Sequence, residues 1–331
     1  MRHPRRRSLL WLAAPFLAVA SSSCHPSGKV THPRESQNDR LNDLAAHSRT
    51  VLTSRKKDGE VRIPFTLRDG GIHLKMVWAG RPVEALLDTG SAFVDWPQSL
   101  HLTSTSTAIP QDDDMAAGVV THGEWMVLSS IKAGGCEWRN MLTVASGEMK
   151  RSGPSKTVTS PEPLLGAPAF RGTVLTIDYQ KKEIIIRGAS YDITRLPHHS
   201  HDLLLTPEWV NGWLPVLKGR LADHPARFAL DSGCGGVVIT TRFANRLPLS
   251  SFGSDTTAKI NGVQVHIRGL KYISGAVAGI PFREDEVPVV DLPVWTHSDA
   301  LAGTAFLERF RVTIDYTRHK VLLEPYSGGH Q

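Results

Sequence analysis

The sequence predicts an all-β protein built from two tandem, closed β lobes that are related by a pseudo-twofold axis. Three observations carry this prediction: short apolar segments that alternate with turn residues, similarity between the two halves of the chain, and a triplet of Asp, Thr or Ser, and Gly that occurs in each half. Apolar alternation with a period of two is typical of strands. Similarity between the halves indicates two units of the same fold.

The run of predicted strands begins at Val61, where a polar N-terminal region gives way to short apolar segments separated by Gly, Asn, Asp and Pro. The clearest are RIPFTL (62–67), IHLKMVW (72–78), VEALLD (83–88), TVLTIDY (173–179) and KEIIIRG (182–188). With 331 residues, of which 40% are hydrophobic and 21% charged, the chain is long enough for two ordinary globular domains.

The repeat is clearest where "VEALLDTGSAFVDW" (83–96) corresponds to "ARFALDSGCGGVVIT" (226–240). The two triplets, 88–90 and 231–233, start 143 residues apart. Each triplet comes directly after an apolar strand, so both lobes are expected to present the same loop.

A second block of similarity follows each triplet. "LLGAPAFRGTVLTIDY" is matched by "LAGTAFLERFRVTIDY", with Gly166 and Gly303, and also Asp178 and Asp315, 137 residues apart. We therefore predict lobe one at 61–197 and lobe two at 202–326, with the seam in "LPHHSHD". The repeated Asp178 and Asp315 are expected to have structural roles at strand ends.

The N-terminus has the features of an export signal. "MRHPRRR" is a basic region, "SLLWLAAPFLAVA" is an apolar core too short to span a membrane permanently, and Ala18-Val19-Ala20 is a small-residue cleavage site. Cleavage after Ala20 and lipidation at Cys24, which would anchor the protein to a membrane, both remain open. Residues 1–23 are thus a predicted signal peptide, and the protein is expected in the periplasm or cell envelope.

Residues 24–60 are polar, with few aliphatic and no aromatic side chains. This composition predicts a flexible tether with one short helix, or alternatively a propeptide that blocks the active site.

The net charge of +6 does not indicate a nucleic-acid partner. Four of the 38 basic residues lie in the first seven positions, and the remaining 34 nearly balance 32 acidic residues. The other cysteines, Cys136 and Cys234, have no metal-binding spacing, and the sequence alone does not decide whether they pair. "HHSHD" (198–202) is interpreted as an exposed linker rather than a metal site.

The duplicated triplet has a chemical explanation. Two carboxylates held close together cannot both ionise easily, so they share one proton. The ionised member can then act as a general base on water while the protonated member donates to a substrate carbonyl. We predict that Asp88 and Asp231 form such a dyad.

With these motifs, the chain resembles the aspartic peptidases, specifically the retropepsin-like domains of bacterial envelope proteins, here fused in tandem as in two-lobed pepsins. The resemblance covers about residues 61–326. It implies an aspartic endopeptidase that cleaves extended peptides or proteins without a cofactor or metal. The alternatives are an envelope module that keeps the fold and binds peptides without cutting them, and lobes that pair with those of a second chain.

The neighbours of the two Asp residues are expected to support them. Thr89 and Ser232 supply hydroxyls that brace the loops, and Gly90 and Gly233 let backbone N–H groups approach the carboxylates. The next positions hold Ser91 in lobe one and Cys234 in lobe two. In the family, a hydroxyl here often bonds the neighbouring carboxylate. Because a thiol is a weaker donor, the resemblance predicts that the lobe-two carboxyl is protonated more readily.

The resemblance also implies a hairpin flap that closes over the substrate by strand addition. We expect it in "GVVTHGEWMVLSSI" (118–131), with a turn at His122-Gly123 and Trp125 as the aromatic contact. Lobe two has a shorter candidate hairpin with a turn at Asn261-Gly262.

Overall fold

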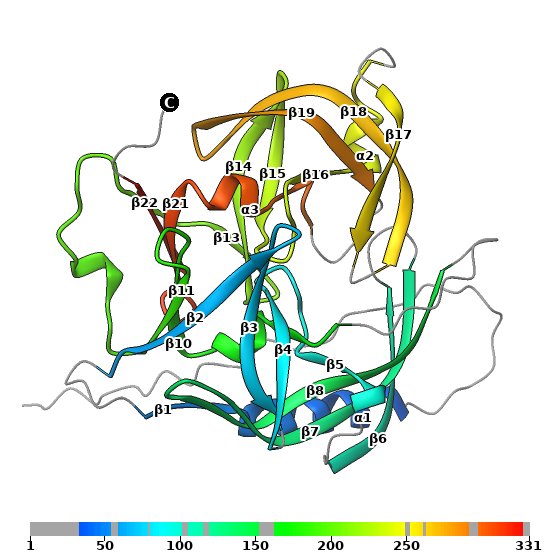
Figure 1. The fold of residues 1–331 in the computed structure, drawn as a ribbon, viewed down its shortest axis with the longest axis vertical. Helices are drawn as coiled ribbons and strands as arrows, with labels where there is room; N and C mark the ends of the chain where they lie inside the picture. Colours follow the sequence, from blue (N-terminus) through cyan, green and yellow to red (C-terminus); the bar gives the residue numbers. More distant parts are fainter. Residues whose placement is uncertain are drawn as a thin grey trace, which may run out of the picture.

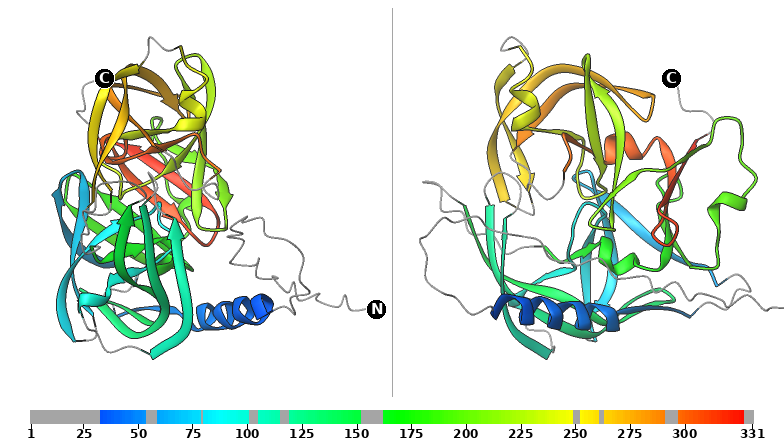
Figure 2. Two further views of the ribbon diagram at one scale, coloured as in Figure 1. Left: turned by 90° about the vertical axis from the view of Figure 1, so that its right-hand side faces the viewer. Right: turned by 180° about the vertical axis from the view of Figure 1, so that it is seen from behind.

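The computed structural model describes residues 33–53, 59–78, 80–100, 105–114, 119–151, 162–248, 252–260, 263–290 and 297–326. Within these ranges the chain is mostly β and forms two lobes, one above the other in Figure 1 and in both views of Figure 2. The predicted all-β fold of two closed lobes is confirmed, and the five strand segments named above correspond to β2, β3, β4, β10 and β11. No helix among the described residues is long and apolar enough to cross a membrane.

Lobe one comprises the strands from β2 to β11. Its sheet curls back on itself because β3 pairs with both β4 and β7. The strands are β2 (Val61–Arg68), β3 (Gly71–Trp78), β4 (Arg81–Asp88), β5 (Asp95–Pro97), β6 (Thr105–Asp114), β7 (Val119–Ala133), β8 (Cys136–Arg151), β9 (Leu164–Gly166), β10 (Thr173–Asp178) and β11 (Glu183–Gly188), with 3-10 turns η1 (Gln98–Leu100) and η3 (Ala167–Phe170).

Lobe two comprises the strands from β12 to β22, and its main sheet closes in the same way through the pairing of β14 with β18. The 3-10 turn η4 (Ile193–Arg195) lies in the connection between the lobes. The elements are β12 (Leu203–Leu205), β13 (Glu208–Val210), β14 (Leu214–Leu221), β15 (His224–Leu230), β16 (Val237–Thr240), α2 (Thr241–Ala244), β17 (Phe252–Ile260), β18 (Val263–Val277), β19 (Ile280–Val290), β20 (Ala300–Ala302), α3 (Thr304–Leu307), β21 (Phe310–Asp315) and β22 (Lys320–Pro325).

A shared sheet joins the two lobes. Its strand order is β12-β22-β21-β10-β11-β2, and the lobes meet where β10 pairs antiparallel with β21. In that pair Thr176 lies opposite Thr313, and their hydroxyls are hydrogen-bonded at 2.9 Å. One hydrophobic cluster of buried residues runs through both lobes, so they do not have separate cores.

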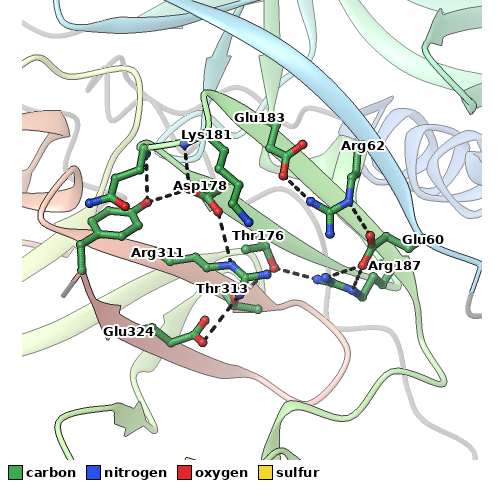
Figure 3. Close-up of polar contacts among 12 residues, drawn as sticks. Glu60, Arg62, Thr176, Asp178, Lys181, Glu183, Arg187, Arg311, Thr313 and Glu324 are labelled. Carbon is green, nitrogen blue, oxygen red and sulfur yellow. Dashed lines mark hydrogen bonds and ion pairs between the residues drawn. The ribbon is translucent and has the colours of Figure 1, made fainter. Parts of the chain in front are cut away.

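The shared sheet also carries a polar network, drawn in Figure 3. Arg187 donates to Glu60 through Nε (3.0 Å) and Nη2 (2.6 Å), and to the Thr176 hydroxyl through Nη1 (3.0 Å). Both members of the ion pair are buried, with side chains 6% and 8% exposed. Burial alone would raise the pKa of Glu60, but Arg187 and Arg62 lower it overall. This carboxylate is therefore ionised and paired.

The repeated aspartates of "TIDY" have the structural roles that the sequence predicts. Asp178 accepts hydrogen bonds from the Lys181 amide (3.0 Å) and the Tyr326 hydroxyl (3.1 Å). Asp315 accepts from the backbone N–H groups of Thr317 and Arg318, both at 2.9 Å. Each carboxylate thus closes the turn that follows its strand.

The segment expected to be a flexible tether is partly folded onto lobe one, which corrects that prediction. Helix α1 (Pro33–His47) leads into β1 (Arg49–Leu52), and β1 pairs antiparallel with β8. The Ser48 hydroxyl donates to Asn140 O at 2.8 Å, and the Thr50 hydroxyl donates to Ala169 O at 3.0 Å. Polar side chains, rather than an apolar stripe, hold this segment in place. Residues 1–32, including the predicted signal and Cys24, lie outside the described part.

Candidate active site

The two candidate catalytic residues occupy equivalent strand ends. Asp88 ends β4, and Asp231 follows β15 directly. Beside β4 runs the short parallel strand β9, with Gly166 opposite Asp88, and beside β15 runs β20, whose Ala302 O accepts the Asp231 N–H at 3.1 Å. Each aspartate is thereby fixed where its strand gives way to a loop.

Gly166 and Gly303 lie directly against these loops. A Cβ added to Gly166 would lie 1.8 Å from Phe93 O, and one added to Gly303 would lie 2.4 Å from Cys234 O. No side chain fits at such distances, so glycine lets β9 and β20 approach the loops closely. The predicted supporting role of these glycines agrees with this packing.

The carboxyl groups of Asp88 and Asp231 meet at the lobe boundary and are hydrogen-bonded to each other. Each also accepts a backbone N–H from its own loop, Gly90 N to Asp88 Oδ1 and Gly233 N to Asp231 Oδ1, both at 2.8 Å. The glycines face the opposite aspartate, because a Cβ on Gly90 would lie 2.5 Å from Asp231 Cγ, and one on Gly233 would lie 2.5 Å from Asp88 Cγ. Any side chain at either glycine would displace a carboxyl group.

Beneath the carboxyls, Thr89 and Ser232 link the loops reciprocally. Thr89 Oγ1 accepts the Ser232 N–H at 3.0 Å and donates to Leu230 O at 3.1 Å. Ser232 Oγ accepts the Thr89 N–H at 3.1 Å and donates to Leu87 O at 2.9 Å. Both residues are fully buried, at 1% and 0% exposed. These four bonds hold the two strand ends in one arrangement.

The electrostatics of the pair follow from burial and proximity. Burial raises the pKa of Asp88 well above its usual range, and the neighbouring Asp231 charge raises it further. Burial also raises the pKa of Asp231, while the hydrogen bond from Asp88 and the loop N–H groups oppose that rise. The two carboxyls therefore retain a proton to higher pH than isolated aspartates, and they titrate as a pair.

The structure does not support the expectation that Cys234 makes its neighbour the more readily protonated partner. Ser91 Oγ donates to Phe93 O at 3.2 Å, and Cys234 Sγ donates to Gly236 O at 3.2 Å. The two groups therefore do the same thing, bonding the backbone two residues further on, so thiol and hydroxyl differ little in their effect on the carboxyls. The larger rise in pKa falls on Asp88. Cys234 and Cys136 are both free, and the Cys234 thiol has a raised pKa because of burial.

The comparisons with known proteins bear on this arrangement. No protein-family model matches the chain, and no curated protein sequence matches it. A solved structure that does match is the aspartic proteinase from Irpex lacteus, with a TM-score of 0.54 and 10% sequence identity over 81% of this chain and 98% of that chain. The fold is that of a pepsin-like aspartic proteinase. At this identity the likeness establishes the architecture of the chain and not its activity.

In this aspartic proteinase fold the predicted flap turn is misplaced. His122 and Gly123 lie inside the long strand β7, opposite Asp112 and Gln111 of β6, and a register shift between Thr121 and Gly123 interrupts the ladder there. The turn joining β6 to β7 falls at 115–118, outside the described residues. The apolar and polar alternation of the segment is that of a strand, and a bulge accommodates the glycine.

Trp125 is not an exposed substrate contact either. Its side chain is 6% exposed and packs with Leu41 of α1, Ile109 and Val144. The ring of Phe93, from the Asp88 loop, meets it edge-on at 5.4 Å. Trp125 therefore supports the active-site loop from behind. The lobe-two turn at Asn261-Gly262 lies outside the described part, but the β6–β7 and β17–β18 hairpins extend toward each other from the two lobes (Figures 1 and 2).

The sequence did not single out the Asp69-Gly70 turn, which lies against the lobe-two loop at Gly235. The adjacent glycines Gly70 and Gly71 at the start of a repeated strand were the available signal. Among the described residues no group of three or more potential metal ligands is placed to hold an ion. The histidines of 198–201 are exposed, and Asp202 accepts the His199 N–H at 2.6 Å.

Proposed function

We propose that this protein is an aspartic endopeptidase in which Asp88 and Asp231 activate water to hydrolyse peptide bonds. The observation that carries the proposal is the hydrogen-bonded pair of carboxyls, contributed by equivalent loops of the two lobes and each held by a loop N–H. The fold of the solved aspartic proteinase supports it.

The proposed mechanism uses the single proton that the pair retains. The ionised carboxylate accepts a proton from a water molecule lying between the two groups, and that water attacks the scissile carbonyl carbon. The protonated carboxyl donates to the carbonyl oxygen, which gives a tetrahedral diol. Return of a proton to the amide nitrogen then breaks the C–N bond, and the pair regains its initial protonation.

The test measures hydrolysis of a denatured protein by purified full-length enzyme between about pH 3 and 8. Asp88→Asn and Asp231→Asn should each abolish turnover, since either one leaves a single carboxyl. Asp223→Asn is the matched control, because its side chain is fully exposed and its ion pair with Arg220 spans 4.0 Å. Binding of a peptide without cleavage by the unaltered protein would instead favour the peptide-binding module.

We further propose that the enzyme is exported to the cell envelope and belongs with the tandem retropepsin-like domains that its motifs resemble. The basic and apolar N-terminus and Cys24 support export. Mass spectrometry of the mature N-terminus distinguishes the two forms. Cleavage after Ala20 leaves an unmodified soluble chain, whereas a lipidated Cys24 places the protein in the membrane fraction, from which Cys24→Ser should release it.

A further inference from the structure

The turn between β2 and β3 reaches from lobe one to the active-site loop of lobe two (Figure 1). Both turn residues have positive φ, 51° at Asp69 and 77° at Gly70. A Cβ on Gly70 would lie 2.7 Å from Gly235 Cα, a distance that non-bonded carbon atoms do not tolerate. Glycine at position 70 is therefore required by its neighbour as well as by its own conformation.

The Gly235 segment that meets this turn is anchored firmly within lobe two. The Cys234 carbonyl accepts the Thr304 N–H at 2.7 Å, and the Gly235 carbonyl accepts the Ala305 N–H at 2.9 Å. The Cys234 N–H in turn donates to Asp231 O at 3.3 Å. Because the segment is held against α3 and is continuous with the candidate catalytic residue, a push at Gly235 reaches Asp231.

On the lobe-one side, the turn is continuous with the strand that supports Asp88. Gly71 begins β3, and the next residue, Ile72, lies opposite Leu87 in β4, one position before Asp88. The Gly70–Gly235 contact thus joins the structures that carry the two carboxyls, at a place separate from the Thr89–Ser232 hydrogen bonds.

The equivalent contact is missing on the other side of the pseudo-twofold axis. The corresponding turn of lobe two, Asn211-Gly212, has the same conformation, with φ of 51° and 75°. Yet a Cβ on Gly212 would have no neighbour within 4 Å in the described structure. The lobe-one residue that corresponds to Gly235, four positions after the aspartate, is Ala92. Only one of the two turns therefore acts as a spacer between the lobes.

We propose that Gly70 is a positioning residue whose contact with Gly235 sets the spacing between the Asp88 and Asp231 loops. The spacing itself is a property of the fold. Its effect on turnover rests on the proposed function.

The experiment compares Gly70→Ala with Gly212→Ala. Both variants impose the same strain on a positive-φ glycine, but only the first places a methyl group against the opposite lobe. The primary readout is the titration of the Asp88 and Asp231 carboxyl carbons by NMR, with Asp231→Asn and Asp88→Asn used for assignment. The nearby titratable groups are Cys234, Tyr179 and Tyr316, and burial raises the pKa of each, so they are silent at acidic pH.

In Gly70→Ala the carboxyls should separate, so the higher of the two pKa values of the pair should fall toward that of an ordinary aspartate. The basic limb of the pH–rate profile should move to lower pH by the same amount. kcat should drop about 10–100-fold, with a smaller change in KM. Gly212→Ala should leave the titration and the kinetics unchanged.

Equal shifts in both variants would assign the effect to turn strain and overturn the proposal, as would no shift in either. If Gly70→Ala does not fold, Gly235→Val tests the same contact from lobe two. A Cβ at Gly235 has room, with Gly70 Cα at 3.7 Å and Asp69 O at 3.6 Å, so only the branched methyls press on the turn. An unchanged titration there would also overturn it. If the unaltered protein shows no hydrolysis, the proposed function fails, whereas the NMR titration still decides the positioning role.

Discussion

Thr89 and Ser232 each accept the backbone N–H of the other and donate to a carbonyl on the far side of the lobe boundary. All the groups involved are buried, so water cannot replace a lost partner. This reciprocity makes the boundary between the lobes a rigid part of the molecule, although the two aspartates above it carry the chemistry.

Thr89→Val should therefore destabilise the protein strongly for a change of nearly equal volume. It leaves the Ser232 N–H and Leu230 O without their partner, each costing about 1–3 kcal/mol when buried and unsatisfied. The free energy of unfolding in urea measures the loss. Thr143→Val is the matched control, since its hydroxyl makes one buried bond, to Met126 O at 3.2 Å, away from the lobe boundary. A loss at Thr89 no greater than that at Thr143 would contradict the assigned role.

Neutralising the candidate dyad should stabilise the protein at neutral pH while removing activity. Because the folded-state pKa of Asp88 is raised, the stability linked to its proton is fully present below about pH 4 and is lost as pH rises through the raised value. Asn cannot ionise and escapes that loss. The melting temperature of Asp88→Asn should therefore exceed that of the unaltered protein by a margin that widens from pH 4 to 7.

Asp192→Asn supplies a contrast of opposite sign. The hydrogen bond from the Thr194 hydroxyl lowers the pKa of Asp192, opposed by burial and aided by the Thr194 N–H and Arg318. Its contribution to stability is present above the ordinary pKa and is lost as pH falls through the lowered value. Asp192→Asn should thus be destabilising at pH 7 and nearly neutral at low pH. Parallel pH trends for the two variants would refute the assignment.

Breaking the buried ion pair of the shared sheet should cost far more than breaking one on the surface. Arg187→Met leaves Glu60 buried without its main partner, and loss of one member of such a pair typically costs about 3–5 kcal/mol. Arg195→Met removes an ion pair to Asp192 in which Arg195 is 85% exposed, and it should cost less than about 1 kcal/mol. Chemical unfolding of both variants tests the difference, and equal values would mean that the Arg187 pair is solvated.

A methyl group at Gly166 should damage both stability and activity. Its Cβ would meet Phe93 O at 1.8 Å, so the Asp88 loop or β9 must move, and overpacking of this severity costs about 3 kcal/mol or more. Gly188→Ala is the control, because nothing lies within 4 Å of the added Cβ there. Unfolding curves together with hydrolysis assays measure both effects. A Gly166→Ala protein as active and stable as Gly188→Ala would contradict the packing argument.

The fold and the pair of aspartates could be predicted because their signals are local and duplicated. An apolar strand ending in Asp88-Thr89-Gly90 is ambiguous by itself, but its second copy at 231–233 turned a possible turn into a pair of loops. The alternation of residues 62–67 and 182–188 likewise matched β2 and β11. In these segments the side-chain pattern and the backbone agree.

The parts that the sequence did not predict depend on contacts between distant segments. The turn expected at His122-Gly123 is a strand with a register shift, because pairing with both β6 and β8 outweighed the local turn signal of the glycine. Trp125 is buried by Leu41, which comes from a segment whose polar composition gave no sign of docking. The Gly70–Gly235 contact joins residues 165 positions apart, and neither residue has a side chain to mark it.

The Thr176–Thr313 pair in the shared sheet has a consequence for the origin of the two-lobed chain. These threonines are 137 residues apart, the same offset that relates the repeated blocks, so each lies opposite its own counterpart in the other lobe. A residue that faces its own equivalent marks a twofold axis, as in an isologous dimer. A single-lobe ancestor could have assembled through this same threonine, one copy from each chain, and gene fusion would then have made a permanent covalent partnership of two strands that had already learned to recognise each other.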